Sequence, residues 1–174
     1  MNKKDIVEIL EQKHQNLFDW LLSSGDENWE KGPVDRWTSG QHVLHLFDSM
    51  VLLNKALKYP KFLLRYKFGT SNRPSRTYDE VAKRYEERLS ENQERARNFN
   101  RDLKKPALKE RKRLIDSLQI QNKKLQYKTS KLKDKHLDTL LLPHPLMGKM
   151  TLREIIMWTA HHTDHHVEIL KKDY

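Results

Sequence analysis

The chain has 174 residues, 36% of them apolar, a net charge of +10 and no cysteine. That length fits one domain over residues 1–174, with enough apolar side chains for a helical core. The lack of cysteine excludes disulfides, thiolate metal ligands and a cysteine nucleophile. The first residues form no apolar signal core, and no stretch reaches the roughly 18 apolar residues of a membrane span. We therefore expect a cytoplasmic protein with no membrane partner.

The positive charge is unevenly placed along the chain. Residues 104–135 contain 12 basic and 3 acidic residues, a balance of +9 that leaves only +1 for the remainder. A basic helix of this kind can bind an acidic partner or nucleic acid. Its lone aromatic residue is Tyr127, so the interleaved aromatic side chains of a single-strand binding platform are missing. This absence argues against nucleic acid and favours a solvated basic helix.

The first expected helix covers residues 5–23, where apolar side chains recur every three or four positions. His14 lies within it between Lys13 and Gln15, and these polar neighbours predict a surface or boundary histidine. Residues 25–37 are expected to form a loop, because glycine and proline interrupt the helical pattern there.

A second helix is expected to begin at a capping box formed by Thr38 and Gln41. It should end near Lys58, because Pro60 disfavours a helical conformation in the residue before it. Its expected apolar stripe consists of Leu44, Phe47 and Val51.

This second helix contains two histidines and a nearby carboxylate. The apolar stripe places His45 leaning inward and His42 towards the flank, by a margin that leaves either one open as a ligand. Asp48 follows His45 by about one turn and could orient a ligating imidazole through a hydrogen bond. The alternative for Asp48 is a solvated carboxylate on the helix surface.

The middle of the chain shows helical patterns without an obvious site. Residues 60–76 are expected to be a connection, after which a capping box of Thr77 and Glu80 begins a charged helix that ends near residue 102. Its glutamates and arginines are expected to form a solvated face. Another helix should cover residues 106–134 and bury a stripe of Leu108, Ile115, Leu118, Leu125 and Leu132.

Residues 137–150 are expected to form a non-helical approach to the last helix, because two prolines forbid a regular helix there. Gly148 permits a tight turn at the end of this segment. A third capping box, Thr151 with Glu154, then begins the last helix. Strand patterns are absent, so the expected fold is all-α, a bundle with its site between facing helices.

Four histidines fall within six residues of this last helix, and helical spacing stacks them as two pairs. The pair His162 and His166 continues an apolar stripe that points into the protein, formed by Leu152, Ile155, Thr159 and Ile169. The pair His161 and His165 is expected on a wetter flank, shared with Glu154, Trp158, Glu168 and Lys172.

The inner pair, His162 and His166, needs hydrogen-bond or metal partners, because an unpaired buried polar group costs about 1–3 kcal/mol. A metal ion shared by the two imidazoles would satisfy both. The alternative is two core histidines that bond to backbone groups or carboxylates. A catalytic zinc usually has three protein ligands, so a third ligand would have to come from another part of the fold.

Two motifs in the chain resemble those of the DinB/YfiT superfamily. The first is WTSGQHVLHLFDS, beginning at Trp37, which resembles the helix-two motif of that family. The second comprises HPLMGKMTL, beginning at His144, together with HTDHH, beginning at His162. They cover both diagnostic ends of the chain, and the two together are more specific than either one.

The resemblance implies a four-helix up-down-down-up bundle with an extra connecting segment. It also implies a divalent metal, often nickel or zinc, on three histidines, which by position are His45, His162 and His166. The resemblance thus selects His45 over His42. Members of the family look like metal-dependent hydrolases or thiol S-transferases, so a small-molecule substrate, such as a low-molecular-weight thiol, is implied. A homodimer is also common in the family.

Three neutral imidazoles would leave the ion its positive charge and an open position, suited to activating water or a thiol near neutral pH. Asp48, His165 and Glu168 are the candidates for proton transfer or for support of the ligands. The alternative function is a non-enzymatic binding module that uses the basic residues 104–135, with structural histidines. A third alternative is a family member that keeps its metal for stability alone.

Overall fold

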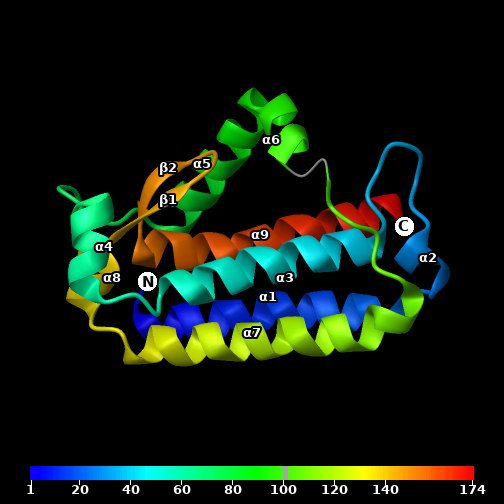
Figure 1. Cartoon of the computed structure of the whole chain (residues 1–174), viewed down its shortest axis with the longest axis horizontal. Helices are drawn as coiled ribbons and strands as arrows, with labels where there is room; N and C mark the ends of the chain where they lie inside the picture. Colours follow the sequence, from blue (N-terminus) through cyan, green and yellow to red (C-terminus); the bar gives the residue numbers. More distant parts are fainter. Residues whose placement is uncertain (100–101) are drawn as a thin grey trace.

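The computed structural model describes residues 1–99 and 102–174, and four long helices dominate it (Figure 1). They are α1 (Lys3–Ser23), α3 (Ser39–Ala56), α7 (Arg111–Lys131) and α9 (Leu152–Asp173). In Figure 1, α1 and α9 run in one direction while α3 and α7 run in the other, which is the up-down-down-up order. The predicted all-α four-helix bundle is confirmed. Within the described residues, no helix has both the length and the apolar character needed to cross a bilayer.

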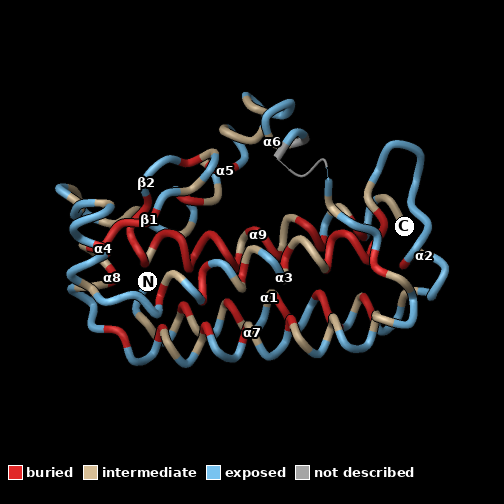
Figure 2. Tube along the Cα trace, in the orientation of Figure 1, coloured by how far each residue is buried: buried red, intermediate tan, exposed pale blue. Residues whose placement is uncertain are grey.

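The burial pattern explains why these helices stay together. The inward side of each long helix is buried and the outward side is exposed, as Figure 2 shows along the bundle. Helix α1 packs against both α9 and α7, and α7 also packs against α3. Their apolar side chains form one continuous core. Burial of apolar surface at about 25 cal/mol per Å² is the main stabilising term for such a bundle.

The three predicted capping boxes are present and set where three of the helices begin. In each, a threonine hydroxyl accepts a hydrogen bond from a backbone N–H three residues later, and the later side chain accepts one from the threonine N–H. Each cap contributes about 1 kcal/mol by satisfying N–H groups that have no helical partner. The pairs are Thr38 with Gln41, Thr77 with Glu80 at the start of α5 (Tyr78–Glu91), and Thr151 with Glu154.

Glu154 also ties the connection before α5 to the start of α9. Its carboxylate is completely buried and accepts two hydrogen bonds from the Arg73 guanidinium and one from the Arg76 backbone N–H. The expectation that Glu154 and Trp158 lie on a wetter flank is wrong, because this connection and α5 cover that side of α9. A buried carboxylate is tolerated here because it is paired and hydrogen-bonded.

Short helices occupy two segments that were expected to be irregular. Helix α2 (Glu27–Glu30) lies in the first connection, where fully buried Trp29 donates its indole N–H to the carbonyl of Ala107. Helix α4 (Lys61–Phe68) lies in the second and is anchored by buried Leu64. Both are held by one large buried side chain, a signal too local to stand out as helical periodicity.

The charged helix expected to end near residue 102 is divided in two. Helix α5 ends at Glu91, Asn92 follows in a non-helical conformation, and α6 (Gln93–Phe99) continues the chain. Residue 102, where the helix was expected to end, lies in a turn. Its solvated face holds one exception, because Glu86 contacts histidines of α9.

The next predicted helix, over residues 106–134, is also interrupted at both ends. It starts with a 3₁₀ turn (Leu108–Glu110), continues as α7 and is followed by α8 (Asp134–Thr139). Of its predicted buried stripe, Leu118 and Leu125 are fully buried, whereas Leu108 is exposed and Ile115 is half-buried. Leu108 is displaced because it belongs to the 3₁₀ turn, whose three-residue repeat does not continue the stripe of α7.

The approach to α9 is a small antiparallel hairpin of β1 (Leu141–His144) and β2 (Gly148–Thr151). The segment is non-helical as predicted from residue 140 onward, whereas residues 137–139 still belong to α8. Gly148 has the positive φ of 72° that suits the expected tight turn. The expectation that strands are absent is wrong. Leu142 of β1 pairs with Met150 of β2, and both side chains are buried. This burial stabilises the hairpin, although the sequence lacks the alternation of apolar and polar residues that would have predicted strands.

The expected apolar stripe of α3 was wrong. The buried stripe of α3 consists of Val43, Leu46, Met50 and Leu53, instead of the predicted Leu44, Phe47 and Val51. Helix α3 is apolar on most sides, so contact with its neighbours selects the stripe, and periodicity alone does not.

His14 is completely buried, although polar neighbours predicted a surface position. Adjacent residues of a helix point about 100° apart, so Lys13 and Gln15 say little about the direction of His14. The informative residues are Leu10 and Leu17, which are buried on the same stripe. Nδ1 of His14 lies 2.8 Å from the carbonyl of Leu10, which satisfies the buried ring.

Candidate metal centre

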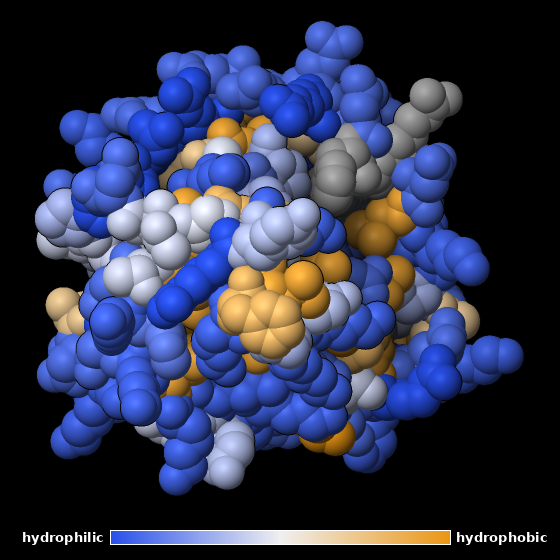
Figure 3. Space-filling view, turned by 60° about the vertical axis from the view of Figure 1, so that its left-hand side comes forward, coloured by the Kyte–Doolittle hydropathy of each residue, from blue (hydrophilic) through white to orange (hydrophobic). Residues whose placement is uncertain are grey.

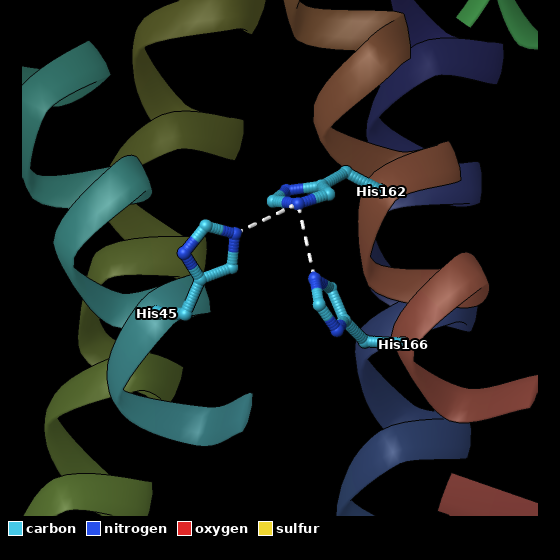
Figure 4. A group of neighbouring side chains, drawn as sticks. All are labelled: His45, His162 and His166. Atoms are coloured by element: carbon cyan, nitrogen blue, oxygen red, sulfur yellow. Dashed lines mark hydrogen bonds between the residues drawn. The ribbon is translucent and has the colours of Figure 1, made fainter. Parts of the chain in front are cut away.

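Three imidazoles from two antiparallel helices converge at the middle of the bundle (Figure 4). Helix α3 supplies His45, and α9 supplies His162 and His166, one turn apart. Nε2 of His162 lies 3.1 Å from Nε2 of His45 and 3.1 Å from Nε2 of His166. His162 and His166 are buried and His45 is half-buried. The structure therefore brings together all three histidines that the sequence motifs selected.

The arrangement of these nitrogens fits a shared cation better than it fits hydrogen bonds. Nε2 of His162 faces two other ring nitrogens, yet it carries at most one proton for both. Two imidazoles on one tetrahedral zinc ion place their nitrogens about 3.3 Å apart, close to the separations seen here. Nδ1 of His162 is buried without a hydrogen-bond partner, so the ring is not fixed by its other nitrogen. The cluster could hold a metal ion.

The electrostatic environment keeps the two inner imidazoles neutral. Burial lowers the pKa of His162 and of His166 well below the usual value, and neighbouring imidazoles lower it further. A neutral imidazole presents a lone pair, which is the form that binds a metal. These two rings therefore require no deprotonation before an ion binds.

His42 supports the cluster from behind. When Nε2 of His166 presents its lone pair to the cluster, the ring proton of His166 lies on its Nδ1. That Nδ1 is 2.8 Å from Nδ1 of His42. Burial, and then the charges of His45 and His165, lower the pKa of His42 to about 3, so its ring is a neutral acceptor. A hydrogen bond of this kind fixes the orientation of a metal ligand. Sequence periodicity placed His42 on the flank, but its ring is buried.

Two tryptophans pack on opposite members of the cluster. The ring of Trp37 lies nearly parallel to that of His166, with centroids 6.0 Å apart, and Trp158 stacks on His162 at 4.4 Å. Trp37 is itself held at its carbonyl by a hydrogen bond from the hydroxyl of Tyr174. These rings limit the access of water and restrict the rotation of the imidazoles.

The other histidine pair of α9 has a different partner. Nε2 of His161 and Nδ1 of His165 lie 2.9 Å and 3.2 Å from the same oxygen of Glu86 on α5. Each imidazole can donate a ring proton to this carboxylate, so both are satisfied without an ion. The ring of Tyr85 lies 5.7 Å from that of His165 and 6.0 Å from that of His162, so it packs beside a member of each pair.

The residues predicted to support the ligands lie around the cluster instead of within it. Asp48 lies on the exposed side of α3. Its carboxyl still loses part of its contact with water, and this raises its pKa. His165 faces Glu86, and exposed Glu168 forms an ion pair with Lys171. The supporting roles of these three residues stay predictions.

The sequence pointed to His42 only as a possible ligand and gave no sign of Glu86. His42 precedes His45 by three residues and so shares its side of the helix, a spacing that could have identified it. Glu86 had no such signal, because its role depends on how α5 crosses α9.

A comparison with protein families decides which family these motifs represent. The model of the DinB superfamily matches residues 9–170, nearly the whole chain. The chain belongs to the DinB superfamily. No curated protein and no solved structure matches it. The three-histidine cluster lies inside the part of the chain that the DinB superfamily model covers.

Proposed function

We propose that this DinB superfamily protein is a metal-dependent enzyme with His45, His162 and His166 as the ligands of one divalent ion. The observation that supports the proposal is the convergence of their three ring nitrogens on one point between α3 and α9. Nickel and zinc are the ions that we propose, since imidazole suits both. The ion would act as a Lewis acid that activates a nucleophile, either water for hydrolysis or a small thiol for S-transfer.

The protein's own part in such a reaction is to hold and shield the ligands. His42 fixes His166 through the 2.8 Å contact between their Nδ1 atoms. Trp158 stacks on His162 and Trp37 on His166, so neither ring can rotate freely. Because the three ligands are neutral imidazoles and not carboxylates, the positive charge of the ion remains available to an anionic nucleophile.

Metal analysis of protein purified without a chelator tests the site directly. We expect about one nickel or zinc ion per chain, as one tetrahedral site requires. Removal of the ion should lower the stability by about 2.7 kcal/mol if its free concentration was 100 times its Kd. Wild-type protein that is free of metal and equally stable with or without added nickel or zinc would contradict the proposal.

Two activity assays separate the proposed reactions. The metal-loaded enzyme is tested on activated esters and amides, and separately for joining a low-molecular-weight thiol to an electrophile. Hydrolysis without thiol transfer identifies a hydrolase, and the reverse identifies an S-transferase. A metal-loaded protein inactive in both assays would instead be a family member whose ion serves stability.

The alternative of a binding module on the basic residues 104–135 gains little support from the contacts. Several of the charges are neutralised by acidic partners within the fold: Arg111 pairs with Asp26, Lys112 with Asp116, and Lys123 with Glu11. Charges paired in this way contribute less to binding a polyanion. Salt-sensitive binding of nucleic acid that Lys123→Ala and Lys124→Ala weaken would restore this alternative.

A further inference from the structure

The end of the bundle that carries α4 exposes an unusual group of apolar side chains. Tyr66 is 89% exposed, Phe62 73%, Tyr59 53% and Leu63 36%. The buried side of α4 faces the hairpin, so Phe62, Leu63 and Tyr66 lie on its outer side, and Tyr59 precedes the helix. Single exposed apolar residues are common, but several on one short helix mark an interaction surface.

A basic segment of the chain surrounds this group. Residues 49–78 contain no aspartate or glutamate, and their basic residues are Lys55, Lys58, Lys61, Arg65, Lys67, Arg73 and Arg76. Of these, Arg73 and Arg76 face buried Glu154. Acidic residues elsewhere bring the net charge outside residues 104–135 to only +1. This total therefore does not reveal the second basic region. We call α4 with Lys58 and Tyr59 the α4 surface.

The fold adds further positive charge next to the α4 surface. Lys149 of the hairpin donates a hydrogen bond to the carbonyl of Phe68 at the end of α4. Partial burial lowers the pKa of His136 on α8, and the nearby charges of Arg65, Lys61, Lys133 and Lys135 lower it further. The cations Lys61 and Arg65 of α4 therefore lie near Lys133 and Lys135 at the start of α8.

The shape of this region also restricts its partner. Helix α4 lies at the extreme end of the bundle, on the left in Figure 1. Figure 3, which brings this end forward, shows apolar side chains at the surface within a hydrophilic surround. A protruding apolar group ringed by lysine and arginine matches the interface of an anionic bilayer, where apolar side chains enter the acyl boundary and cations meet the headgroups.

We propose that the α4 surface docks the protein on anionic phospholipid membranes. The lack of a bilayer-crossing helix among the described residues does not bear on this, because peripheral docking requires no span. A second copy of the chain is a poor partner, since a symmetric contact would oppose two surfaces of the same charge. Nucleic acid would use the cations and aromatic rings but not Leu63, because bases stack on aromatic rings.

Sedimentation with lipid vesicles tests the proposal. The full chain, loaded with metal, is mixed with phosphatidylcholine vesicles that contain phosphatidylserine, or with phosphatidylcholine vesicles alone. We expect it to sediment with the anionic vesicles at low salt and to be released as salt is raised. The double variants Phe62→Ser/Tyr66→Ser and Arg65→Glu/Lys67→Glu should each weaken binding by roughly tenfold or more.

Matched variants on α7 provide the controls. Tyr127→Ser removes another exposed aromatic ring, and Lys112→Glu/Arg113→Glu reverses two exposed charges away from α4. These variants should bind vesicles as the wild type does. All variants should keep the wild-type metal content and thermal unfolding, which separates this test from that of the proposed enzyme.

Three results would overturn the proposal. One is wild-type protein that does not sediment with anionic vesicles at low salt. Another is equal binding by the α4 variants and the wild type, or equal loss in the α7 controls. The third is an oligothymidylate that binds more tightly than the vesicles and is lost in the same α4 variants, which would assign the surface to nucleic acid.

Discussion

The two histidine pairs of α9 have the same composition and spacing but different surroundings. His162 and His166 face α3, where their ring nitrogens lie next to those of two other imidazoles, His45 and His42. His161 and His165 face α5, where one carboxylate oxygen of Glu86 lies within 3.2 Å of both rings. The first pair is buried, whereas the second is half-buried and next to a half-exposed acid.

The difference shows that neighbouring helices decide what an i,i+4 histidine pair can do. A carboxylate accepts hydrogen bonds from imidazole N–H groups, so the pair facing α5 is satisfied by hydrogen bonds. Imidazoles that face one another have too few protons to share, so the pair facing α3 is suited to a cation. The spacing predicts two candidate pairs, and only the facing side chains distinguish them.

Removal of one member of each pair gives the largest expected difference. His162→Ala and His166→Ala should reduce the metal content from about one ion per chain to nearly none, because two ligands rarely retain zinc. His161→Ala and His165→Ala should keep it, since Glu86 and not the ion is their partner. Elemental analysis of the four variants, purified side by side, measures this. Equal losses in all four would remove the distinction between the pairs.

A third side of α9 makes the comparison sharper, because there a buried imidazole, that of His14, lies within hydrogen-bond distance of a backbone carbonyl and a hydroxyl. Oγ1 of Thr163 lies 3.3 Å from Nε2 of His14, and burial lowers the pKa of His14 to about 4. The unfolded chain binds the proton near pH 6.5, so this contribution to stability is complete above that pH and is lost as the pH falls towards 4. The loss amounts to about 3 kcal/mol, at 1.36 kcal/mol per pKa unit.

His14→Leu tests this third environment. The variant should lose less stability than the wild type between pH 7 and pH 4, by about 3 kcal/mol, because it has no imidazole to protonate. Urea unfolding at a series of pH values measures the free energy of unfolding of both proteins. The contributions of the other buried histidines are the same in both and cancel in the difference. Parallel pH profiles would show that His14 does not become protonated on unfolding.

A substitution behind the α3-facing pair should have an intermediate effect. His42→Phe keeps a ring of similar shape but removes the acceptor for the Nδ1 proton of His166. Loss of such a partner weakens metal affinity about 10–100-fold. Competition with a chromophoric chelator measures the affinity, and the ratio of metal to protein at saturation should stay near that of the wild type. Unchanged affinity would mean that the 2.8 Å contact does not position the ligand.

The smallest effect is expected from the partner of the α5-facing pair. Glu86→Gln removes the negative charge, but the side chain is 48% exposed, so the stability should fall by only about 0.5 kcal/mol. The metal content should not change. Glu87→Gln, at the exposed neighbouring position, is the matched control and should be neutral. A loss of metal in Glu86→Gln alone would show that the two pairs are coupled through α9.

Local signals in the sequence were sufficient for the starts of the main helices. The capping boxes at Thr38, Thr77 and Thr151 are confirmed because they depend on residues three apart. The convergence of His45 with His162 and His166 was also anticipated, since the motifs at both ends of the chain specify it.

Contacts between distant segments could not be anticipated in the same way. The apolar stripe of α3 was wrong, because apolar residues on several sides allow more than one stripe and only the packed neighbours choose. The hairpin was missed because its strands are short and contain Pro143, and its pairing is stabilised by burial of Leu142 and Met150. Glu86 reached the histidines only through the crossing of α5 over α9.

The hydrogen bond from Tyr174 to the carbonyl of Trp37 has a practical consequence for anyone who handles the protein. Trp37 covers His166. Gly32 packs so closely on Trp37 and Tyr174 that a side chain there would collide with them. A fusion or a truncation at Tyr174 is therefore expected to disturb the packing of Trp37 on the histidine cluster. Affinity handles and fluorescent labels are better attached near Met1, whose half-exposed side chain lies at the opposite end of the bundle.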